Sequence, residues 1–245
     1  MLNKHLFAIY TKAQLPTHVD LPWQIQDVDL WLRITKILRL REGAEFILFN
    51  GSTQVTLTLD HGTFLSKNIV HGRIVEVSTS KPLQPTVTLL QGIPKKTVFE
   101  EIIYNAAQLG VATIVPVKTD KAHPLDFSAK EITRFTSIMI AACEQAKQFI
   151  VPVIATPITL QSVLTKMSDK NIVFDSSGSL CEMLLPKIKL AQHISVLFGP
   201  EGGLTDQELI IVEQSNFIKS RLTPTILRSQ DAPLVGIGLL RTLIS

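Results

Sequence analysis

The sequence predicts an α/β protein, with a mostly parallel sheet covered by helices on both faces and a small β-barrel in front of it. Two observations lead to this prediction. After about residue 82, short apolar runs alternate with helical segments, which is the order that builds a parallel sheet. Before residue 78, short apolar runs follow one another with one helix among them, as in a small all-β unit. We therefore expect domains at 1–78 and 79–245.

The first domain contains four strand-like runs and one helix. The runs are residues 6–10, 45–49, 54–59 and 73–77. Asn50-Gly51 separates the second run from the third and is a strong signal for a hairpin turn. The helix is expected at about 28–40, where apolar residues recur at helical spacing and Gly43 follows.

Four basic residues lie along or just after that helix: Arg33, Lys36, Arg39 and Arg41. They could be a solvated face with cations near the negative end of the helix dipole. They could also contact the phosphates of a nucleic acid. The sequence leaves both interpretations open.

The second domain alternates strands and helices along its whole length. Strands are expected at 87–90, 111–117, 151–154, 172–174, 194–198 and 220–222, and helices at 98–109, 128–147, 159–168, 179–187, 205–217 and 232–244. Four of these helices open with the spacing of a capping box, which satisfies backbone N–H groups at a helix start. The pairs are Thr97/Glu100, Ser128/Glu131, Ser179/Glu182 and Thr205/Glu208.

Residues 194–208 form the segment most typical of a ligand site. An apolar strand runs into Gly199-Pro200-Glu201-Gly202-Gly203, and a helix starts at the Thr205 box. Open α/β proteins bind ligands at such turns, beyond the carboxyl ends of strands. Neither G-x-x-x-x-G-K-[ST] nor G-x-G-x-x-G is present, so the common phosphate and dinucleotide motifs are excluded. An ordinary tight loop is the alternative interpretation.

The composition favours a reduced, cytoplasmic, soluble protein. Hydrophobic residues make up 45% of the chain, yet no run reaches the about 18 apolar residues of a membrane span. The two cysteines and six histidines show no metal-ligand spacing, so no metal is expected. The net charge of +3 is compatible with nucleic acid without requiring it.

Two further segments carry candidate polar residues. Glu144 stands among small residues of the 128–147 helix, so it is either a structural hydrogen-bond partner or part of a site. Arg228 lies in the loop between the strand at 220–222 and the last helix, where it is either a surface charge or a site cation.

With these segments in view, the chain resembles the RsmE family of the SPOUT superfamily over nearly its whole length. The motifs that carry the resemblance are Leu197-Phe198-Gly199-Pro200-Glu201-Gly202-Gly203-Leu204, Ala141-Ala142-Cys143-Glu144-Gln145 with Val151-Pro152, Leu109-Gly110-Val111, Leu227-Arg228, and Ile37-Leu38-Arg39-Leu40 through Phe49-Asn50-Gly51. The family methylates N3 of a uridine in 16S ribosomal RNA with S-adenosylmethionine. The resemblance therefore implies this reaction on the small ribosomal subunit or its RNA.

The resemblance also implies a PUA-like barrel for RNA, a catalytic domain with a trefoil knot, and a homodimer. It places residues from two loops around the methyl donor: Leu197, Gly199 and Gly203 from the first, and Leu222, Pro224, Ile226 and Leu227 from the second. A cation near the target base would stabilise the anion that forms when N3 loses its proton. Arg228 is our candidate for this role, and Glu144 is a candidate base or a partner that orients Arg228.

The chain departs from the family pattern at several polar positions. Val98 stands where the family usually has a lysine and Gln148 where it has an arginine, and the final loops carry Thr225 and Gln230 in place of an arginine and a glutamate. The alternatives are therefore another SPOUT reaction, such as ribose 2′-O-methylation of transfer RNA, or a non-catalytic RNA-binding or assembly protein.

Overall fold

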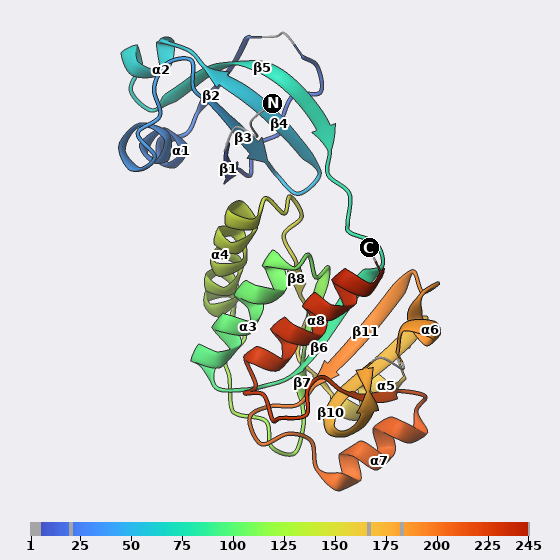
Figure 1. The fold of residues 1–245 in the computed structure, drawn as a ribbon. Helices are drawn as coiled ribbons and strands as arrows, with labels where there is room; N and C mark the ends of the chain where they lie inside the picture. The colour runs from blue at the N-terminus through green and yellow to red at the C-terminus, as the bar shows by residue number, and fades with distance from the viewer. Residues whose placement is uncertain (1–5, 20–21, 166–167, 182–183, 245) are drawn as a thin grey trace. The chain divides into compact units, whose positions relative to one another are not determined.

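The computed structural model describes residues 6–19, 22–165, 168–181 and 184–244, with no side-chain detail for residue 185. The chain divides into two compact units (Figure 1). One extends to Lys81 and also includes Glu144–Ile150, and the other contains Pro82–Cys143 and the chain from Val151 onward. Among the described residues no helix combines the length and the apolar character that crossing a membrane would require.

Within the described residues, the first unit is built on a five-stranded sheet in the order β1-β3-β4-β5-β2. β1 and β3 are parallel, and the other pairs are antiparallel. In this part of the chain no pairing of β1 with β2 closes the sheet into a continuous ring. The strands are β1 (Phe7–Tyr10), β2 (Pro22–Gln26), β3 (Glu45–Phe49), β4 (Thr53–Leu59) and β5 (Ile69–Thr79), and a short helix α2 (Gly62–Leu65) precedes β5.

The predicted hairpin between β3 and β4 is confirmed. Asn50 Oδ1 accepts hydrogen bonds from the N–H groups of Ser52 and Thr53, at 3.1 and 2.9 Å. Gly51 has a φ of +91°, a conformation that only glycine adopts without strain. The asparagine side chain and the glycine backbone together turn the chain within the few residues available.

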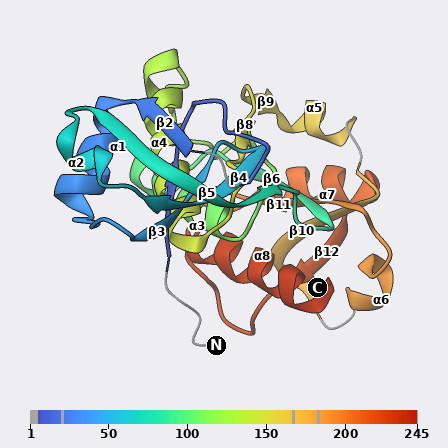
Figure 2. The ribbon, with the colours of Figure 1, turned by 90° about the horizontal axis from the view of Figure 1, so that it is seen from above.

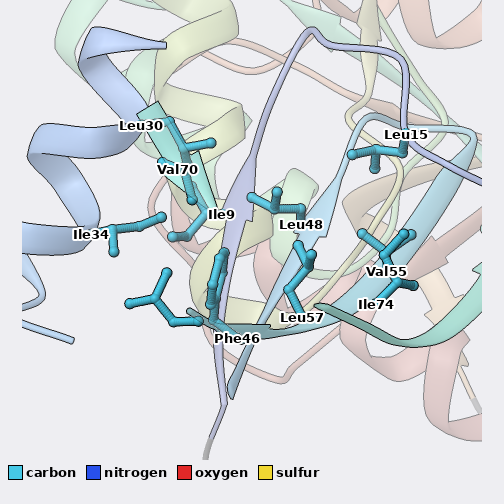
Figure 3. Close-up of a cluster of buried hydrophobic side chains, with 11 residues drawn as sticks. Ile9, Leu15, Leu30, Ile34, Phe46, Leu48, Val55, Leu57, Val70 and Ile74 are labelled. Carbon is cyan, nitrogen blue, oxygen red and sulfur yellow. The ribbon is translucent and has the colours of Figure 1, made fainter. Parts of the chain in front are cut away.

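The predicted helix at 28–40 consists of two shorter segments. α1 (Val28–Leu32) is followed by a π-helical segment η1 (Arg33–Ile37). Leu30 of α1 and Ile34 of η1 pack on strand residues such as Phe46 in the unit's hydrophobic core (Figure 3). Arg39 has a φ of +52°, so the chain leaves the helical conformation before the predicted end.

The second unit contains a seven-stranded sheet among the described residues, and every strand pair in it is parallel. This confirms the predicted parallel sheet. The order is β12-β10-β11-β6-β7-β8, with β9 also paired to β7. The strands are β6 (Thr86–Gly92), β7 (Thr113–Lys118), β8 (Val153–Ile154), β9 (Ile158–Thr159), β10 (Lys170–Leu180), β11 (His193–Phe198) and β12 (Ile218–Arg221).

Helices cover both faces of this sheet, as predicted (Figure 2). On one face, residues of α5 and α7 form a core cluster with strand residues such as Val173 and Leu197. On the other face α8 lies against β10 and β11, because Gly236 leaves room for the rings of Phe174 and Phe198. The helices are α3 (Lys96–Gln108), α4 (Ala129–Ala146), α5 (Leu160–Leu164), α6 (Leu185–Ile188), α7 (Asp206–Gln214) and α8 (Asp231–Ile244).

Arg241 fastens α8 to the end of α3. Its guanidinium donates to the backbone oxygens of Pro85, Leu109 and Gly110 at 2.6, 3.0 and 2.7 Å. The last two oxygens lie at the carboxyl end of α3, where helix carbonyls lack partners within the helix. Burial lowers the pKa of Arg241 from its ordinary value.

Of the four predicted capping boxes, the one at Thr205/Glu208 is confirmed. At α3 the prediction is wrong: Lys95 is the N-cap residue and makes no side-chain cap, while Glu100 pairs with Arg134. At α4 the N–H and hydroxyl of Ser128 donate to Asp126, which lowers the pKa of that carboxyl. The helix start at Lys96 and the contact of Ser128 with Asp126 are both features that the spacing alone does not reveal.

The predicted helix at 179–187 is also wrong at its start. β10 continues to Leu180, because Ser179 and Leu180 pair with Ser220 and Arg221 of β12. The predicted Ser179/Glu182 box involves Glu182, which lies outside the described residues, while Ser179 itself is a strand residue. Gly178 allows the close approach, because a Cβ there would come within 2.5 Å of the Ser220 backbone.

Candidate active site

A cavity of about 480 Å³ lies at the carboxyl ends of β11 and β12, beside an irregular stretch of the neighbouring strand β10. Its wall includes residues 174–177 of β10, the glycine turn after β11, and the loop after β12. Protein sites that bind small molecules have this size. In proteins with parallel sheets, such sites lie at the carboxyl ends of the strands. The position therefore agrees with the predicted ligand turn.

The glycine turn, residues 199–205, depends on glycine at two positions. Gly203 has a φ of +67°, and its N–H donates to the oxygen of Pro200 at 2.9 Å. Gly199 lies so close to the returning chain that a Cβ would be 2.9 Å from the Gly203 backbone. The absence of side chains here leaves backbone groups next to the cavity.

Side chains from the loop after β7 hold the outer side of this turn. Lys121 Nζ donates to the oxygen of Gly202 at 2.7 Å. Glu208 is buried, and its two carboxylate oxygens accept the N–H groups of Asp120 and Thr205, each at 2.9 Å. These contacts connect the turn to residues 119–121, more than 80 residues earlier in the chain.

Two contacts from the β6 side complete the support of the turn. Gln91 Nε2 donates to the oxygen of Gly199 at 3.1 Å, and Glu201 Oε1 accepts the N–H of Lys95 at 3.0 Å. The other carboxylate oxygen of Glu201 is 3.5 Å from Nε2 of His123. The turn is therefore fixed from β6 and from the loop that follows β7.

The second loop, residues 222–228, has fewer restraints. Thr223 Oγ1 donates to the oxygen of Thr225 at 2.6 Å, and the Arg228 side chain donates to Asp231 at 2.9 Å. Ile226 is 88% exposed although it is apolar. An exposed apolar side chain beside a cavity is available to cover a bound ligand.

The residues predicted to bind the donor have different positions in the structure. Five of them line the cavity: Gly199, Gly203, Leu222, Ile226 and Leu227. Leu197 is fully buried in the core below it, and Pro224 is exposed and outside the cavity wall.

The two residues predicted to act in catalysis have partners of their own. Arg228 is paired with Asp231, its side chain is 77% exposed, and it lies outside the cavity wall between two residues that line it. Glu144 belongs to the other compact unit. There both of its oxygens are bound by Arg33, at 2.9 and 2.6 Å, and one also accepts the N–H of Tyr10.

The four basic residues predicted to bind RNA lie at or after η1. Arg33 is occupied by Glu144, as described above. Lys36 is exposed, with Nζ 5.7 Å from the centre of the Trp31 ring. Arg39 and Arg41 are exposed at the surface of the first unit.

Three cavity residues with strong polar groups were not identified from the sequence: Asp175, Arg221 and Ser229. Nε of Arg221 and Oγ of Ser229 are buried and have no hydrogen-bond partner in the described structure. Asp175 directly follows the predicted strand 172–174, and Arg221 lies in the predicted strand 220–222 and is the last residue of the observed β12. The rule that ligands bind at carboxyl ends of parallel strands could have pointed to both.

An all-parallel sheet with a cavity built from two loops at its carboxyl edge defines an α/β domain that binds a small molecule. Residues 80–241 match the family of the RNA methyltransferase domain. Because this match covers most of the chain, the protein belongs to that family.

Individual relatives are similar in sequence to this chain over most of their length. The chain is 28% identical over 221 residues to ribosomal RNA small subunit methyltransferase E of Synechocystis sp., covering 86% of this chain and 70% of that protein. It is 29% identical over 224 residues to the protein of the same name from Buchnera aphidicola, covering 86% and 84%.

Solved structures extend the similarity to the whole fold. The crystal structure of ribosomal RNA small subunit methyltransferase E from Neisseria gonorrhoeae, bound to S-adenosyl methionine, matches with a TM-score of 0.82 and 27% identity. The match covers 98% of each chain. A probable rRNA-methyltransferase from Porphyromonas gingivalis shares the fold at 18% identity, with a TM-score of 0.74.

Proposed function

We propose that this protein transfers a methyl group from S-adenosylmethionine to N3 of a uridine in the 16S ribosomal RNA of the small subunit. The observation that carries the proposal is the cavity, which both predicted donor loops line in the chain's own structure. Support comes from similarity to the Neisseria protein, which covers 98% of the chain and whose structure contains the same donor.

The residues around the cavity fit this donor. Leu204, Leu222, Ile226 and Leu227 offer apolar contacts for an adenine ring, and the glycine turn exposes peptide groups for hydrogen bonds. Buried polar groups without partners, on Arg221 and Ser229, match a ligand that is itself polar at one end. When bound, S-adenosylmethionine supplies a methyl group already activated by a sulfonium, so the protein mainly has to position the reactants.

In this proposal the target base approaches the loop 222–228. N3 of uridine carries a proton at neutral pH, and a nearby cation stabilises the negative charge that develops as the proton leaves. Arg228 is the proposed cation. Its exposed side chain can leave Asp231 and contact the base instead, because a surface ion pair contributes only about 0–1 kcal/mol to stability. The role of Glu144 as a base stays a prediction.

The proposal also covers the finer architecture. The family resemblance supports a trefoil knot in the second unit, a PUA-like barrel in the first unit and a homodimer. The exposed Lys36, Arg39 and Arg41 would contact RNA phosphates, while Arg33 is held by Glu144. A ribosomal RNA substrate would place the enzyme in the cytoplasm.

Nucleoside analysis tests the proposed reaction. Ribosomal RNA from cells with and without the gene is digested and analysed by mass spectrometry, and we expect 3-methyluridine to be lost from 16S RNA in its absence. A loss of a 2′-O-methylated nucleoside from transfer RNA would identify the alternative reaction. No change together with no calorimetric binding of S-adenosylmethionine at millimolar concentration would favour a non-catalytic RNA-binding protein.

Substitution of Arg228, followed by a measurement of the methylation rate, tests its proposed role as the cation. Arg228→Ala should lower the rate of methylation of purified small subunits or their RNA by at least tenfold. Removing a group that stabilises charge in the transition state typically lowers the rate by this factor or more. Arg134→Ala, which removes an exposed arginine paired with Glu100, is the control. A wild-type rate for Arg228→Ala would contradict the assignment.

A further inference from the structure

Arg221 is a cation in the cavity wall that no sequence motif identified. It is the last residue of β12 and is only partly exposed. Its Nε–H group is buried without a hydrogen-bond partner in the described structure. A guanidinium stays charged in proteins, and a buried donor of a charged group that lacks a partner is costly. Such a group in a cavity therefore indicates a ligand acceptor.

Ser229 provides a second donor on the same wall, from the other end of the loop 222–228. Its Oγ is also buried without a partner. It stands two residues before α8, a helix of 14 residues whose N-terminal end carries partial positive charge. Arg221 and Ser229 thus bring two hydrogen-bond donors and favourable electrostatics to one cavity.

Three acidic residues line the cavity, Asp175, Glu201 and Asp206, and the first two have partners of their own. Asp175 Oδ1 accepts the N–H and the hydroxyl of Ser177, at 2.9 and 2.6 Å. Glu201 is bound by Lys95 and lies near His123. None of the three forms an ion pair with Arg221 in the described residues, so a ligand anion can supply the charge that compensates it.

We propose that Arg221, assisted by Ser229, binds the carboxylate of the amino acid part of the methyl donor. The inference rests on the proposed function. The carboxylate is the anionic group of this donor, and the planar arginine side chain matches it in geometry. A cavity of about 480 Å³ suits one small molecule, which favours the donor carboxylate over an RNA phosphate as the anion inside it.

Calorimetric titration of the full-length protein with two ligands tests the proposal. S-adenosylmethionine has the amino acid end, and 5′-methylthioadenosine has the same adenosine and sulfur without it. Arg221→Gln should weaken binding of S-adenosylmethionine by about 10- to 100-fold, the usual effect of losing a hydrogen bond to a charged group. Binding of 5′-methylthioadenosine should stay within about twofold. Arg221→Lys, which keeps the charge, should recover part of the affinity.

Lys219→Ala is the matched control. Lys219 lies on the same strand, pairs with Glu213 and is outside the cavity wall, so both affinities should equal those of the wild type. Ser229→Ala should weaken S-adenosylmethionine binding by a smaller factor, about 3- to 10-fold, because the lost hydrogen bond comes from a neutral hydroxyl. Thermal melting of each variant shows whether the fold is intact.

The outcomes separate the two levels of inference. If the wild type binds neither ligand, the proposed function fails and this inference fails with it. If the wild type binds both but Arg221→Gln weakens both equally, Arg221 does not read the carboxylate and the inference alone is overturned. The same holds if Arg221→Gln leaves both ligands unaffected and lowers only the affinity for a ribosomal RNA fragment, since the anion would then be a phosphate.

Discussion

The two loops that line the cavity are held by very different numbers and kinds of contacts. The glycine turn, residues 199–205, is bound from the β6 side by Gln91 and Lys95 and from the β7 side by Asp120 and Lys121. The loop 222–228 has hydrogen bonds mainly to residues within three or four positions of itself. One side of the cavity is therefore shaped in advance, and the other can adapt to what binds.

This difference suggests a division of roles under the proposed function. A preshaped turn reduces the entropy lost when a small donor binds. A loosely held loop has a low free energy of local opening, as segments that move during ligand binding usually do. The comparison predicts that substitutions in the support of the glycine turn cost stability, whereas those in the loop 222–228 affect activity with little change in stability.

The largest loss of stability is expected for Glu208→Ala. The substitution removes the charged acceptor of two partly buried hydrogen bonds, those from the N–H groups of Asp120 and Thr205, at about 1–3 kcal/mol each. We expect the free energy of unfolding, measured by urea denaturation, to fall by about 2–4 kcal/mol. Glu213→Ala in the same helix removes an exposed carboxylate and is the control, with an expected loss below about 1 kcal/mol. Equal losses for the two variants would contradict the special role of Glu208.

Gly199→Ala should have the next largest effect. The added Cβ would be 2.9 Å from the backbone of Gly203 and Leu204, so the turn has to open, at about 1–3 kcal/mol. Affinity for S-adenosylmethionine should fall with it, by at least tenfold in calorimetry. Gly238→Ala is the control, since a Cβ there meets nothing within 4 Å and alanine favours the α8 helix. A stable Gly199→Ala protein with wild-type donor affinity would show that the turn is less rigid than its contacts indicate.

The contrast between the loops also explains which features the sequence could predict. Local signals were sufficient for the parallel strands and for the Thr205 box, because strand periodicity and capping depend on neighbouring residues. The contacts of Asp120 and Lys121 with the glycine turn join residues 81 to 88 positions apart, and no local pattern encodes them. The same limit applies to the pair of Arg33 and Glu144, which are 111 positions apart.

The predicted helix at 179–187 starts too early for a related physical reason. Ser179 has the spacing of a cap, but pairing with Ser220 on β12 satisfies its backbone groups in a strand instead. Tertiary pairing overrides a local preference of about 1 kcal/mol. Arg221, at the end of β12, was overlooked because the motif that drew attention to this loop begins one residue later, at Leu222.

Lys121→Ala tests the outer support of the glycine turn at a smaller scale. The variant loses the hydrogen bond to the oxygen of Gly202, and we expect about 0.5–1.5 kcal/mol less stability, at the low end because Lys121 is exposed. The donor affinity should fall about threefold, because the turn loses one of its restraints. Lys118→Ala, which removes a nearby exposed lysine of β7, should change neither quantity. If Lys118→Ala lowered the donor affinity as much as Lys121→Ala does, nearby positive charge would matter more than the hydrogen bond to Gly202.

The smallest change in stability is expected for Arg228→Ala, and it gives the sharpest test of the comparison. The substitution removes a surface ion pair with Asp231, while the backbone oxygen of residue 228 still accepts the N–H groups of Asp231 and Ala232. The free energy of unfolding should therefore change by less than about 1 kcal/mol. If methylation nevertheless falls at least tenfold, the loop 222–228 serves the reaction more than the fold. A loss of stability as large as that of Glu208→Ala would show that both loops support the structure equally.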